Sequence, residues 1–407
     1  MTQRLSRRTF LPLLGAGTLA GMTWLMSARF GTAQRARPRG AGHYVYVGTY
    51  TAPGTAPGGR EPSTAEGIYV FRMEPRDGNL SLAQVVPASN PSYLALDASL
   101  TRLYCVNEDD TGQVSAFSID AARGTLQLLN SVASNGIAPT HLSVHPSGRY
   151  VLAANYGSGS CPVFPIRADG SLGPMTDLFQ SAGNGTGPNP NRQDGPHAHH
   201  ILTDPAAQHV FAVDLGADKI NVLQLALDSG TLTPNQVPFA PLASGSGPRH
   251  LAFHMSEPRA YVLNELASSV TVFEYDAERG AMTWLQTISA LPARFNGDNT
   301  AGEIRIHPDG RFLYTTNRGH DSIASFAIDP SSGRLDSLGW QATDGEWPRG
   351  MNIDPTGSFL YAANQNTNSI AVFRIQRSNG RLQQTGLITT PTPSDVAFGR
   401  PIDQGAT

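Results

Sequence analysis

A repeat of about fifty residues constrains the fold of this chain more than any other feature of its sequence. In each copy a proline opens an alternating apolar stretch, a turn follows, and a second apolar stretch ends in Asn or Asp. The repeat is seen in PSYLALD from residue 91, PTHLSVHPSGRYVLAAN from 139, PRHLAFHMSEPRAYVLN from 248 and PRGMNIDPTGSFLYAAN from 348. Weaker copies start at residues 196, 301 and 393. This period is in the range of a four-stranded propeller blade.

The two ends of the repeat array complement each other. HYVYVGTY from His43 matches the second strand of a repeat and has no first strand before it, whereas PSDVAFG from Pro393 is a first strand without a second. We therefore predict an all-β fold, a seven-bladed β-propeller over residues 43–400 with four-stranded blades, followed by a tail at 401–407. The C-terminal strand joins the N-terminal blade and closes the ring, which removes the sheet edges that invite aggregation.

The composition agrees with such a fold and excludes some partners. The 42 Gly and 30 Pro, with only 15% charged residues, fit short strands joined by tight turns. A net charge of −3 gives no basic footprint for nucleic acid, and no stretch after the N-terminus is apolar enough to span a bilayer. We expect a monomer without nucleic-acid or membrane partners. Cys105 and Cys161 fall on strands of neighbouring repeats, so we expect two buried free thiols.

The N-terminal segment differs from the repeats. SRRTFL at residues 6–11 places two arginines before a mildly apolar run, Phe10–Met26, and this resembles a twin-arginine export signal. A short membrane anchor is the alternative, but the run is brief for a spanning helix and contains Pro12 and three glycines. We interpret residues 1–36 as a signal peptide and short linker, and expect the mature protein to be periplasmic or exported.

Strand polarity places a candidate site at one mouth of the propeller channel. The first strand of each blade runs away from one face and the second returns to it, so the start of the first and the end of the second surround the same mouth. The first-strand positions are Ser92, Thr140, His199, Arg249, Gly302, Arg349 and Ser394. The second-strand positions are Tyr50, Glu108, Tyr156, Leu215, Glu265, Arg318 and Gln365. Charge gathers on blades four to seven, an asymmetry expected of a binding site on a symmetric scaffold.

Three histidines in DGPHAHHILTDP, His197, His199 and His200, have several possible roles. They could be metal ligands, structural residues, or groups that move protons or bind substrate. No cluster of carboxylates or cysteines accompanies them, so we expect no metal and no cofactor and favour proton transfer or substrate binding. His141 and His250 share the repeat position of His200, and we expect His141 and His250 to face the packing between blades in a hydrogen-bonded structural role.

Several motifs together resemble the lactonase family of seven-bladed propellers, which includes bacterial 6-phosphogluconolactonases and fungal 3-carboxymuconate cyclases. They are DGPHAHHILTDP, SGPRHLAFH, NELASSV, IHPDGRFLYTTNRGHDSI and WPRGMNIDPTG, and the resemblance extends over nearly all of residues 43–400. It implies an active site at the channel mouth with a histidine, arginines and a glutamate. Carried over by motif, these catalytic residues are His197, Glu265, Arg249 and Arg318.

The repeat positions add three candidate substrate-binding residues. Arg349 of WPRG and Glu108 both stand at the predicted mouth. His199 stands there in the gapless repeat alignment, whereas the DGP motif favours His197, so both are kept and His197 ranks first.

This set of residues is suited to binding and hydrolysing an anionic lactone. Arginine binds carboxylate or phosphate in bidentate fashion, so two arginines would hold the anionic group while another stabilises the oxyanion formed as water attacks the carbonyl. A histidine or Glu265 would take the proton from that water. Salt bridges to Glu265, Glu108 or Asp214 are the alternative role of the arginines. A cyclase-type isomerase and a non-catalytic exported binding propeller remain alternatives, and export disfavours phosphorylated sugar lactones, which are made in the cytoplasm.

Overall fold

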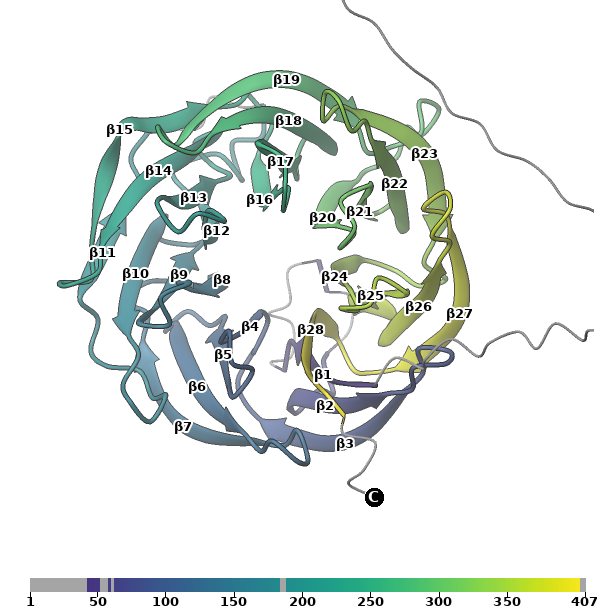
Figure 1. The fold of residues 1–407 in the computed structure, drawn as a ribbon, viewed down its shortest axis with the longest axis horizontal. Helices are drawn as coiled ribbons and strands as arrows, with labels where there is room; N and C mark the ends of the chain where they lie inside the picture. Colours follow the sequence, from purple (N-terminus) through teal and green to yellow (C-terminus); the bar gives the residue numbers. More distant parts are fainter. Residues whose placement is uncertain (1–41, 52–57, 60–61, 184–187, 403–407) are drawn as a thin grey trace, which may run out of the picture. The chain divides into compact units, whose positions relative to one another are not determined.

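The computed structural model describes residues 42–51, 58–59, 62–183 and 188–402. Within these residues the strands form seven four-stranded antiparallel sheets, set side by side in a ring with their first strands innermost (Figure 1). The predicted fold, a seven-bladed β-propeller, is therefore confirmed. The predicted signal segment at 1–36 and residues 403–407 of the predicted tail lie outside the described residues.

The blades follow one another along the chain. Blade one contains β28 (Pro393–Pro401), β1 (His43–Thr49), β2 (Gly67–Met73) and β3 (Leu80–Pro87). Blade two contains β4 (Leu94–Leu96), β5 (Arg102–Asn107), β6 (Gln113–Ile119) and β7 (Leu126–Ala133). Blade three contains β8 (Pro139–Val144), β9 (Tyr150–Asn155), β10 (Ser160–Pro165) and β11 (Asp177–Gln180). Blade four contains β12 (Ala198–Thr203), β13 (Val210–Asp214), β14 (Lys219–Ala226) and β15 (Thr231–Pro241).

The remaining blades complete the ring. Blade five contains β16 (Pro248–Phe253), β17 (Arg259–Asn264), β18 (Ser269–Asp276) and β19 (Ala281–Ser289). Blade six contains β20 (Thr300–Ile306), β21 (Phe312–Arg318), β22 (Ser322–Ile328) and β23 (Leu335–Ala342). Blade seven contains β24 (Pro348–Ile353), β25 (Phe359–Asn364), β26 (Ser369–Ile375) and β27 (Leu382–Thr389), with a short 3-10 helix, η1 (Gln365–Thr367), after β25. No helix in this part of the chain is long and apolar enough to cross a membrane.

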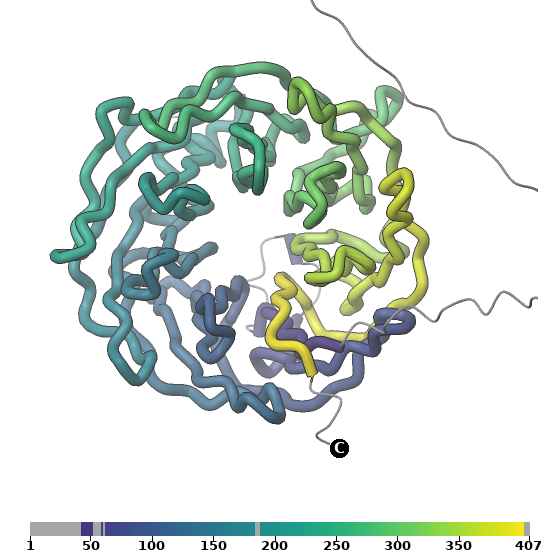
Figure 2. The backbone as a smooth tube through the Cα atoms, in the orientation of Figure 1, coloured from purple at the N-terminus to yellow at the C-terminus, as the bar shows by residue number. Residues whose placement is uncertain are grey.

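Ring closure by the C-terminal strand is confirmed. Strand β28 pairs antiparallel with β1, with Tyr46 opposite Ala397 and Val47 opposite Val396. Figure 2 shows the C-terminal strand (yellow) lying beside the N-terminal strands (purple). Val396 and Ala397 are buried, so the closing strand contributes apolar contacts as well as backbone hydrogen bonds.

A repeated hydrogen bond joins neighbouring blades. In five blades a buried tyrosine of the second strand donates to a glycine carbonyl in a hairpin turn of the next blade. The pairs are Tyr46 to Gly124 (2.9 Å), Tyr104 to Gly170 (3.1 Å), Tyr261 to Gly333 (2.9 Å), Tyr314 to Gly380 (2.8 Å) and Tyr361 to Gly78 (2.6 Å). The last pair joins blade seven to blade one, so the apolar packing and these bonds continue across the closure. Cys105 and Cys161 are buried and free, as expected.

A β-bulge near the start of the first strand shapes the mouth of most blades. In blade four Ala198 pairs with Asp214 and His200 with Val213, which leaves His199 without a partner in the ladder. The same register shift occurs at Thr140, Arg249, Arg349 and Ser394. A bulge re-aims side chains and breaks the simple alternation of faces. It therefore sets which side chains reach the mouth.

Candidate active site

A cavity of about 380 Å³ lies at the mouth predicted from the repeat positions. It is lined by Gly58, Glu108, Thr140, Tyr156, Arg192, His199, Arg249, Glu265, Thr300, Arg318, Trp347 and Arg349. A second cavity of about 480 Å³ shares Thr300, Arg318 and Trp347 with it. Six of the seven predicted site residues therefore meet at one cavity, and His197 is the exception. Four arginines face two glutamates there, which leaves an excess of positive charge.

Glu265 joins three of the arginines. Its Oε2 accepts from Arg249 Nη1 and lies 2.9 Å from Arg318 Nη2, while its Oε1 accepts from Arg192 Nη2 at 2.6 Å. The carboxylate is almost completely buried. Burial alone would raise the pKa of Glu265, but the charges of Arg318, Arg249 and Arg192 hold it well below its ordinary value. Glu265 is therefore an ionised anchor for the arginines, and so low a pKa makes it a poor general base.

Arg249 is held against the backbone of blade six. Its Nε donates to Gly302 O at 2.6 Å, and a Cβ added at Gly302 would lie only 2.5 Å from Thr316 Oγ1. A side chain at this mouth position would thus collide with Thr316 and with the backbone carbonyls of Pro348 and Arg349. Burial lowers the pKa of Arg249, and nearby Arg349 acts in the same direction, although Glu265 opposes both.

Arg318 is the arginine of the cavity whose positive charge is least stabilised by its surroundings. Its Nη2 donates to Ala301 O at 2.8 Å, its guanidinium lies 5.4 Å from the Trp347 ring, and its buried Nε has no partner among the described residues. Burial, reinforced by Arg249 and Arg349 and opposed by Glu265, lowers the pKa of Arg318 to about 9. An anion in the cavity would relieve this repulsion.

Arg349 occupies the other side of the cavity. Its guanidinium lies 5.0 Å from the Tyr50 ring, and its Nη2 is 3.7 Å from Glu108 Oε1, which is a loose ion pair. Glu108 itself accepts from Tyr50 Oη at 2.7 Å and from Ser92 Oγ at 2.5 Å. Burial works against the charge of Arg349, but Tyr50, Glu108 and Glu265 raise its pKa. Arg349 is therefore fully charged and only loosely paired.

His199 lies inside the cavity, beside Arg249. Its Nε2 forms a short hydrogen bond with Arg249 Nη1 and is 3.9 Å from Glu265 Oε2. Burial, followed by the charges of Arg249, His250 and Arg349, holds the pKa of His199 well below its ordinary value. The ring is therefore neutral at pH 7, and a neutral imidazole has a lone pair that can take a proton.

His197 precedes β12 and lies outside the residues that line the cavity. Its ring stacks on Tyr156 with centroids 4.6 Å apart. Its Nδ1 donates to Tyr156 O at 3.0 Å, and its Nε2 is 2.8 Å from Asp194 Oδ1. Both nitrogens therefore face oxygen acceptors, which leaves no lone pair directed at a substrate. Asp214 accepts from the backbone N of His197 at 2.8 Å rather than pairing with a mouth arginine.

Five side chains of the cavity were not among the seven predicted site residues: Thr140 and Tyr156, which do stand at predicted mouth positions, and Arg192, Thr300 and Trp347. Arg192 comes from the long connection between blades three and four, and its Nε donates to Tyr156 Oη at 2.9 Å. Trp347 lies just before β24 and covers Arg318. The only sequence signal for Arg192 was its place in the run NRQDGP, directly before the histidine motif. A loop insertion has no repeat position to align.

As expected, His141 and His250 are buried and hydrogen-bonded to neighbouring blades: His141 Nδ1 accepts from Ile201 N at 3.3 Å, and His250 Nδ1 lies 2.8 Å from Glu303 Oε1. His141 and His200 have ring centroids 3.8 Å apart, and His250 lies 4.6 Å from His200. Tyr93 of blade two lies 5.8 Å from His250 of blade five, and these blades are not neighbours, so the rings meet at the centre of the propeller.

We call this group next to the mouth cavity the channel cluster; Tyr93 and Arg305 are partly exposed and its other members are buried. It contains Tyr93, His141, His200, His250, Glu303, Arg305 and Asp395. Among the described residues, no group of three or more histidine, cysteine, aspartate or glutamate side chains has an arrangement that could hold a metal ion.

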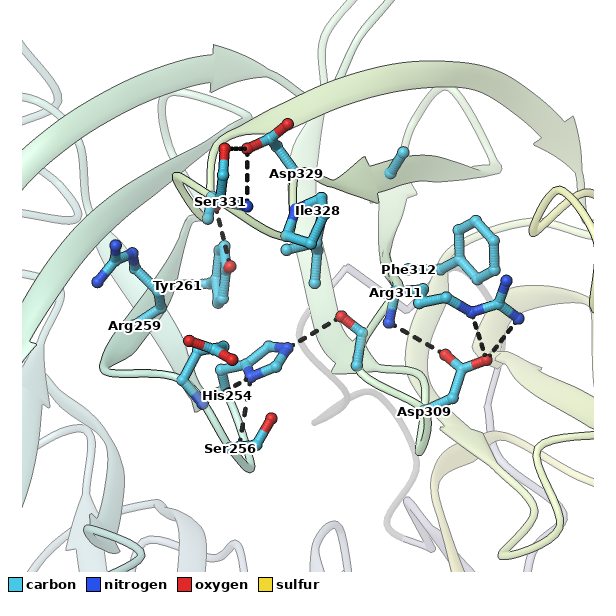
Figure 3. Close-up of a pocket in the computed structure, with 15 residues that line it drawn as sticks. His254, Ser256, Arg259, Tyr261, Asp309, Arg311, Phe312, Ile328, Asp329 and Ser331 are labelled. Carbon is cyan, nitrogen blue, oxygen red and sulfur yellow. Dashed lines mark hydrogen bonds and ion pairs between the residues drawn. The ribbon is translucent and has the colours of Figure 1, made fainter. Parts of the chain in front are cut away.

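A further cavity, of about 400 Å³, lies between blades five and six at the opposite ends of the same strands (Figure 3). Its polar groups are hydrogen-bonded within their own turns or to a turn of the neighbouring blade. Arg311 donates to Asp309 at 2.7 Å and Ser331 Oγ donates to Asp329 at 2.6 Å, while His254 Nε2 bonds to Gly310 O at 2.9 Å. This cavity therefore lacks the convergent, underpaired charges of the mouth.

Comparison with known proteins agrees with the fold and extends over almost all of it. The 6-phosphogluconolactonase of Bacillus subtilis is 39% identical over 307 residues, 75% of this chain and 83% of that protein. The 6-phosphogluconolactonase of Serratia proteamaculans is 35% identical over 70% of this chain and 81% of that protein. The periplasmic gluconolactonase of Pseudomonas aeruginosa has a similar structure, with a TM-score of 0.82 and 34% identity over 89% of this chain and 100% of that one. Residues 44–398 match the family model described as lactonase, 7-bladed beta-propeller, so this chain belongs to the lactonase family of seven-bladed β-propellers.

Proposed function

We propose that this protein hydrolyses an anionic lactone in the mouth cavity. The observation that carries the proposal is a neutral, buried His199 beside four arginines that are only partly neutralised by two glutamates. Such a cavity attracts an anion and places a base beside it. Membership of the lactonase family supports the same reaction class.

Arg318 and Arg349 are proposed to hold the anionic group of the substrate. Arg318 has a buried Nε without a partner in the described part of the chain, and Arg349 has only a 3.7 Å ion pair. Both can therefore donate hydrogen bonds without breaking a strong existing contact, and a planar guanidinium suits carboxylate or phosphate oxygens.

Arg249 and His199 are proposed to act on the reacting carbonyl. His199 Nε2 takes a proton from water as the water oxygen adds to the carbonyl carbon, and the guanidinium of Arg249 turns to the oxyanion that forms. The tetrahedral intermediate then collapses, the ring C–O bond breaks, and the proton on His199 passes to the leaving alkoxide. The product is a hydroxy acid. Glu265 keeps its negative charge throughout and holds Arg249, Arg318 and Arg192 in place.

Export is compatible with a lactone of an aldonic acid, which is neutral, or with a lactone of an aromatic-derived acid that keeps a free carboxylate. We favour the second type, because it carries the anionic group that Arg318 and Arg349 are proposed to hold. A related structure is named a periplasmic gluconolactonase, and the twin-arginine-like motif at residues 6–11 suggests export for this chain too. The relatives from Bacillus subtilis and Serratia proteamaculans are named 6-phosphogluconolactonase, so a phosphorylated lactone belongs in the comparison.

A panel of lactones tests the proposal directly. Acid release by the purified protein is measured with phosphorylated and aromatic-derived lactones and with aldonic and other neutral lactones. Conversion of a carboxymuconate measures the cyclase reaction. We expect hydrolysis of at least one anionic lactone, with unchanged activity after prolonged dialysis against EDTA. Cyclase activity alone, or binding without turnover, would replace the proposal with one of its alternatives.

Substitution of Arg349 is expected to separate binding from chemistry. Arg349→Ala should raise KM for an anionic lactone by roughly tenfold or more with a smaller change in kcat, because a ground-state contact to the anion is lost. A neutral lactone serves as the internal control and should be affected far less. Equal losses on the two substrates would show that Arg349 acts on the structure of the cavity rather than on the anion.

A further inference from the structure

The channel cluster contains a histidine–carboxylate pair directly beneath His199. His250 Nδ1 lies 2.8 Å from Glu303 Oε1, and both side chains are completely buried. The same oxygen, Glu303 Oε1, also accepts from Arg305 Nη1 at 2.8 Å, so the carboxylate has a cationic partner as well. The rings of His199 and His250 have centroids 5.4 Å apart and an interplanar angle of 66°. The proposed reaction gives this pair no role.

The contacts of His199 identify the nitrogen that carries its proton. Arginine can only donate hydrogen bonds, so the contact with Arg249 requires His199 Nε2 to be the acceptor. A neutral imidazole then carries its proton on Nδ1. That nitrogen is buried and has no partner among the described residues. A buried N–H donor without an acceptor is costly, so an acceptor is to be expected nearby.

The contacts of His250 also place its proton on Nδ1, but they leave an acceptor rather than a donor without a partner. Burial raises the pKa of Glu303, but Arg305 and His250 outweigh it and lower the pKa to about 2, so this carboxylate is ionised and accepts. His250 Nδ1 must therefore donate to it, and Nε2 is left as a lone-pair acceptor. His250 Nε2 is also buried and has no partner within the described chain. The two neighbouring rings thus present one unsatisfied donor and one unsatisfied acceptor.

We propose that the His250–Glu303 pair is the positioning partner of His199, with one buried water accepting from His199 Nδ1–H and donating to His250 Nε2. A polar site between such groups is where buried water is normally found. The arrangement fixes His199 in the tautomer whose Nε2 faces the cavity. This inference rests on the proposed role of His199 as the base.

The negative charge of Glu303 gives the pair a second effect. Through the hydrogen bonds of His250 and the water, the Glu303 charge stabilises the imidazolium that forms when His199 Nε2 takes a proton. Carboxylates hydrogen-bonded to catalytic or metal-bound histidines have the same effect. The proton on Nδ1 stays in place throughout. The other charged or titratable groups that face the two rings are Arg249, Arg305, Arg349, Glu265, Tyr93, Tyr156, His141 and His200, and Asp395 acts on Glu303 and Arg305.

Two variants test the pair against a matched control. Glu303→Gln and His250→Phe should lower kcat roughly tenfold to a hundredfold while KM changes less than about twofold. The acid limb of the kcat/KM profile of Glu303→Gln should move to lower pH, because the imidazolium loses a stabilising charge. His200→Phe makes the same ring exchange in the same layer, without a carboxylate partner, and should keep parent activity. Near-ultraviolet circular dichroism and the Tm identify correctly folded variants.

Nitrogen-15 NMR of the parent protein supplies a readout that does not depend on variant folding. The His199 signals are assigned by their loss in His199→Ala, and at neutral pH we expect a neutral ring protonated at Nδ1. An Nε2–H tautomer or an imidazolium would overturn the inference. So would folded Glu303→Gln and His250→Phe proteins that match His200→Phe, and in that case an inactive His199→Ala would leave the proposed function standing. An active His199→Ala would instead refute the proposed function and the inference together.

Discussion

A chain that ends at Thr390 is expected not to form the closed ring. The deletion removes β28, which is the innermost strand of blade one and pairs with β1 from Thr49 to His43. It removes the buried Val396 and Ala397 and exposes the apolar side chains around them. Burial of one large aliphatic side chain stabilises a fold by about 1.5–3 kcal/mol, and burial of an alanine by less. The deletion also leaves the edge of β1 unpaired. Since domains of this kind are stable by about 5–15 kcal/mol, we expect aggregation or a Tm far below that of the intact protein.

Two measurements decide this prediction. Thermal unfolding and size-exclusion chromatography compare the deletion with a control that ends at Ile402, which keeps all of β28 and should behave like the parent. A chain ending at Thr390 that melts at the parent temperature and stays active would show that the closing strand is dispensable.

Replacement of His199 is expected to cause the largest loss of turnover among folded variants. His199→Ala removes the group proposed to take the proton from water, and such groups contribute about a hundredfold to ten-thousandfold. The ring is buried but neutral, so its loss leaves no uncompensated charge, and folding should be largely retained. Steady-state kinetics on the best lactone of the panel, with the Tm as the folding check, measure the effect.

His197→Ala is the matched comparison, because it removes a histidine two residues away that stacks at the rim. We expect a smaller loss there, and a larger one would move the proton-transfer role to His197. Glu265→Gln should also be nearly inactive, but for a different reason. It leaves Arg249 and Arg318 without their shared buried carboxylate, so its stability should fall by about 3–5 kcal/mol, and the activity loss is then accompanied by a lower Tm.

The architecture and much of the site could be predicted from the sequence alone. The repeat period set the number of blades, and the unmatched strands at His43 and Pro393 required the ring to close through the C-terminus. Strand polarity then placed Arg249, Arg349 and Glu265 at one mouth, where they do meet. These inferences succeed because a propeller fixes the position of each repeat residue by symmetry, so local sequence is enough to place it.

Only the tertiary structure decided which histidine enters the cavity and what surrounds it. The bulge at His199 shifts the alternation of faces by one residue, and that shift depends on pairing with β13, which no local pattern reveals. Arg192 reaches Glu265 from an insertion without a repeat position, and the ionised state of Glu265 follows from cations on three separate elements. The channel cluster, likewise, brings together residues from opposite sides of the ring. Sequence by itself determined the scaffold and the direction of its strands, because both follow from the repeat. The protonation states and contacts at the mouth arise from charges that only the closed ring brings close together.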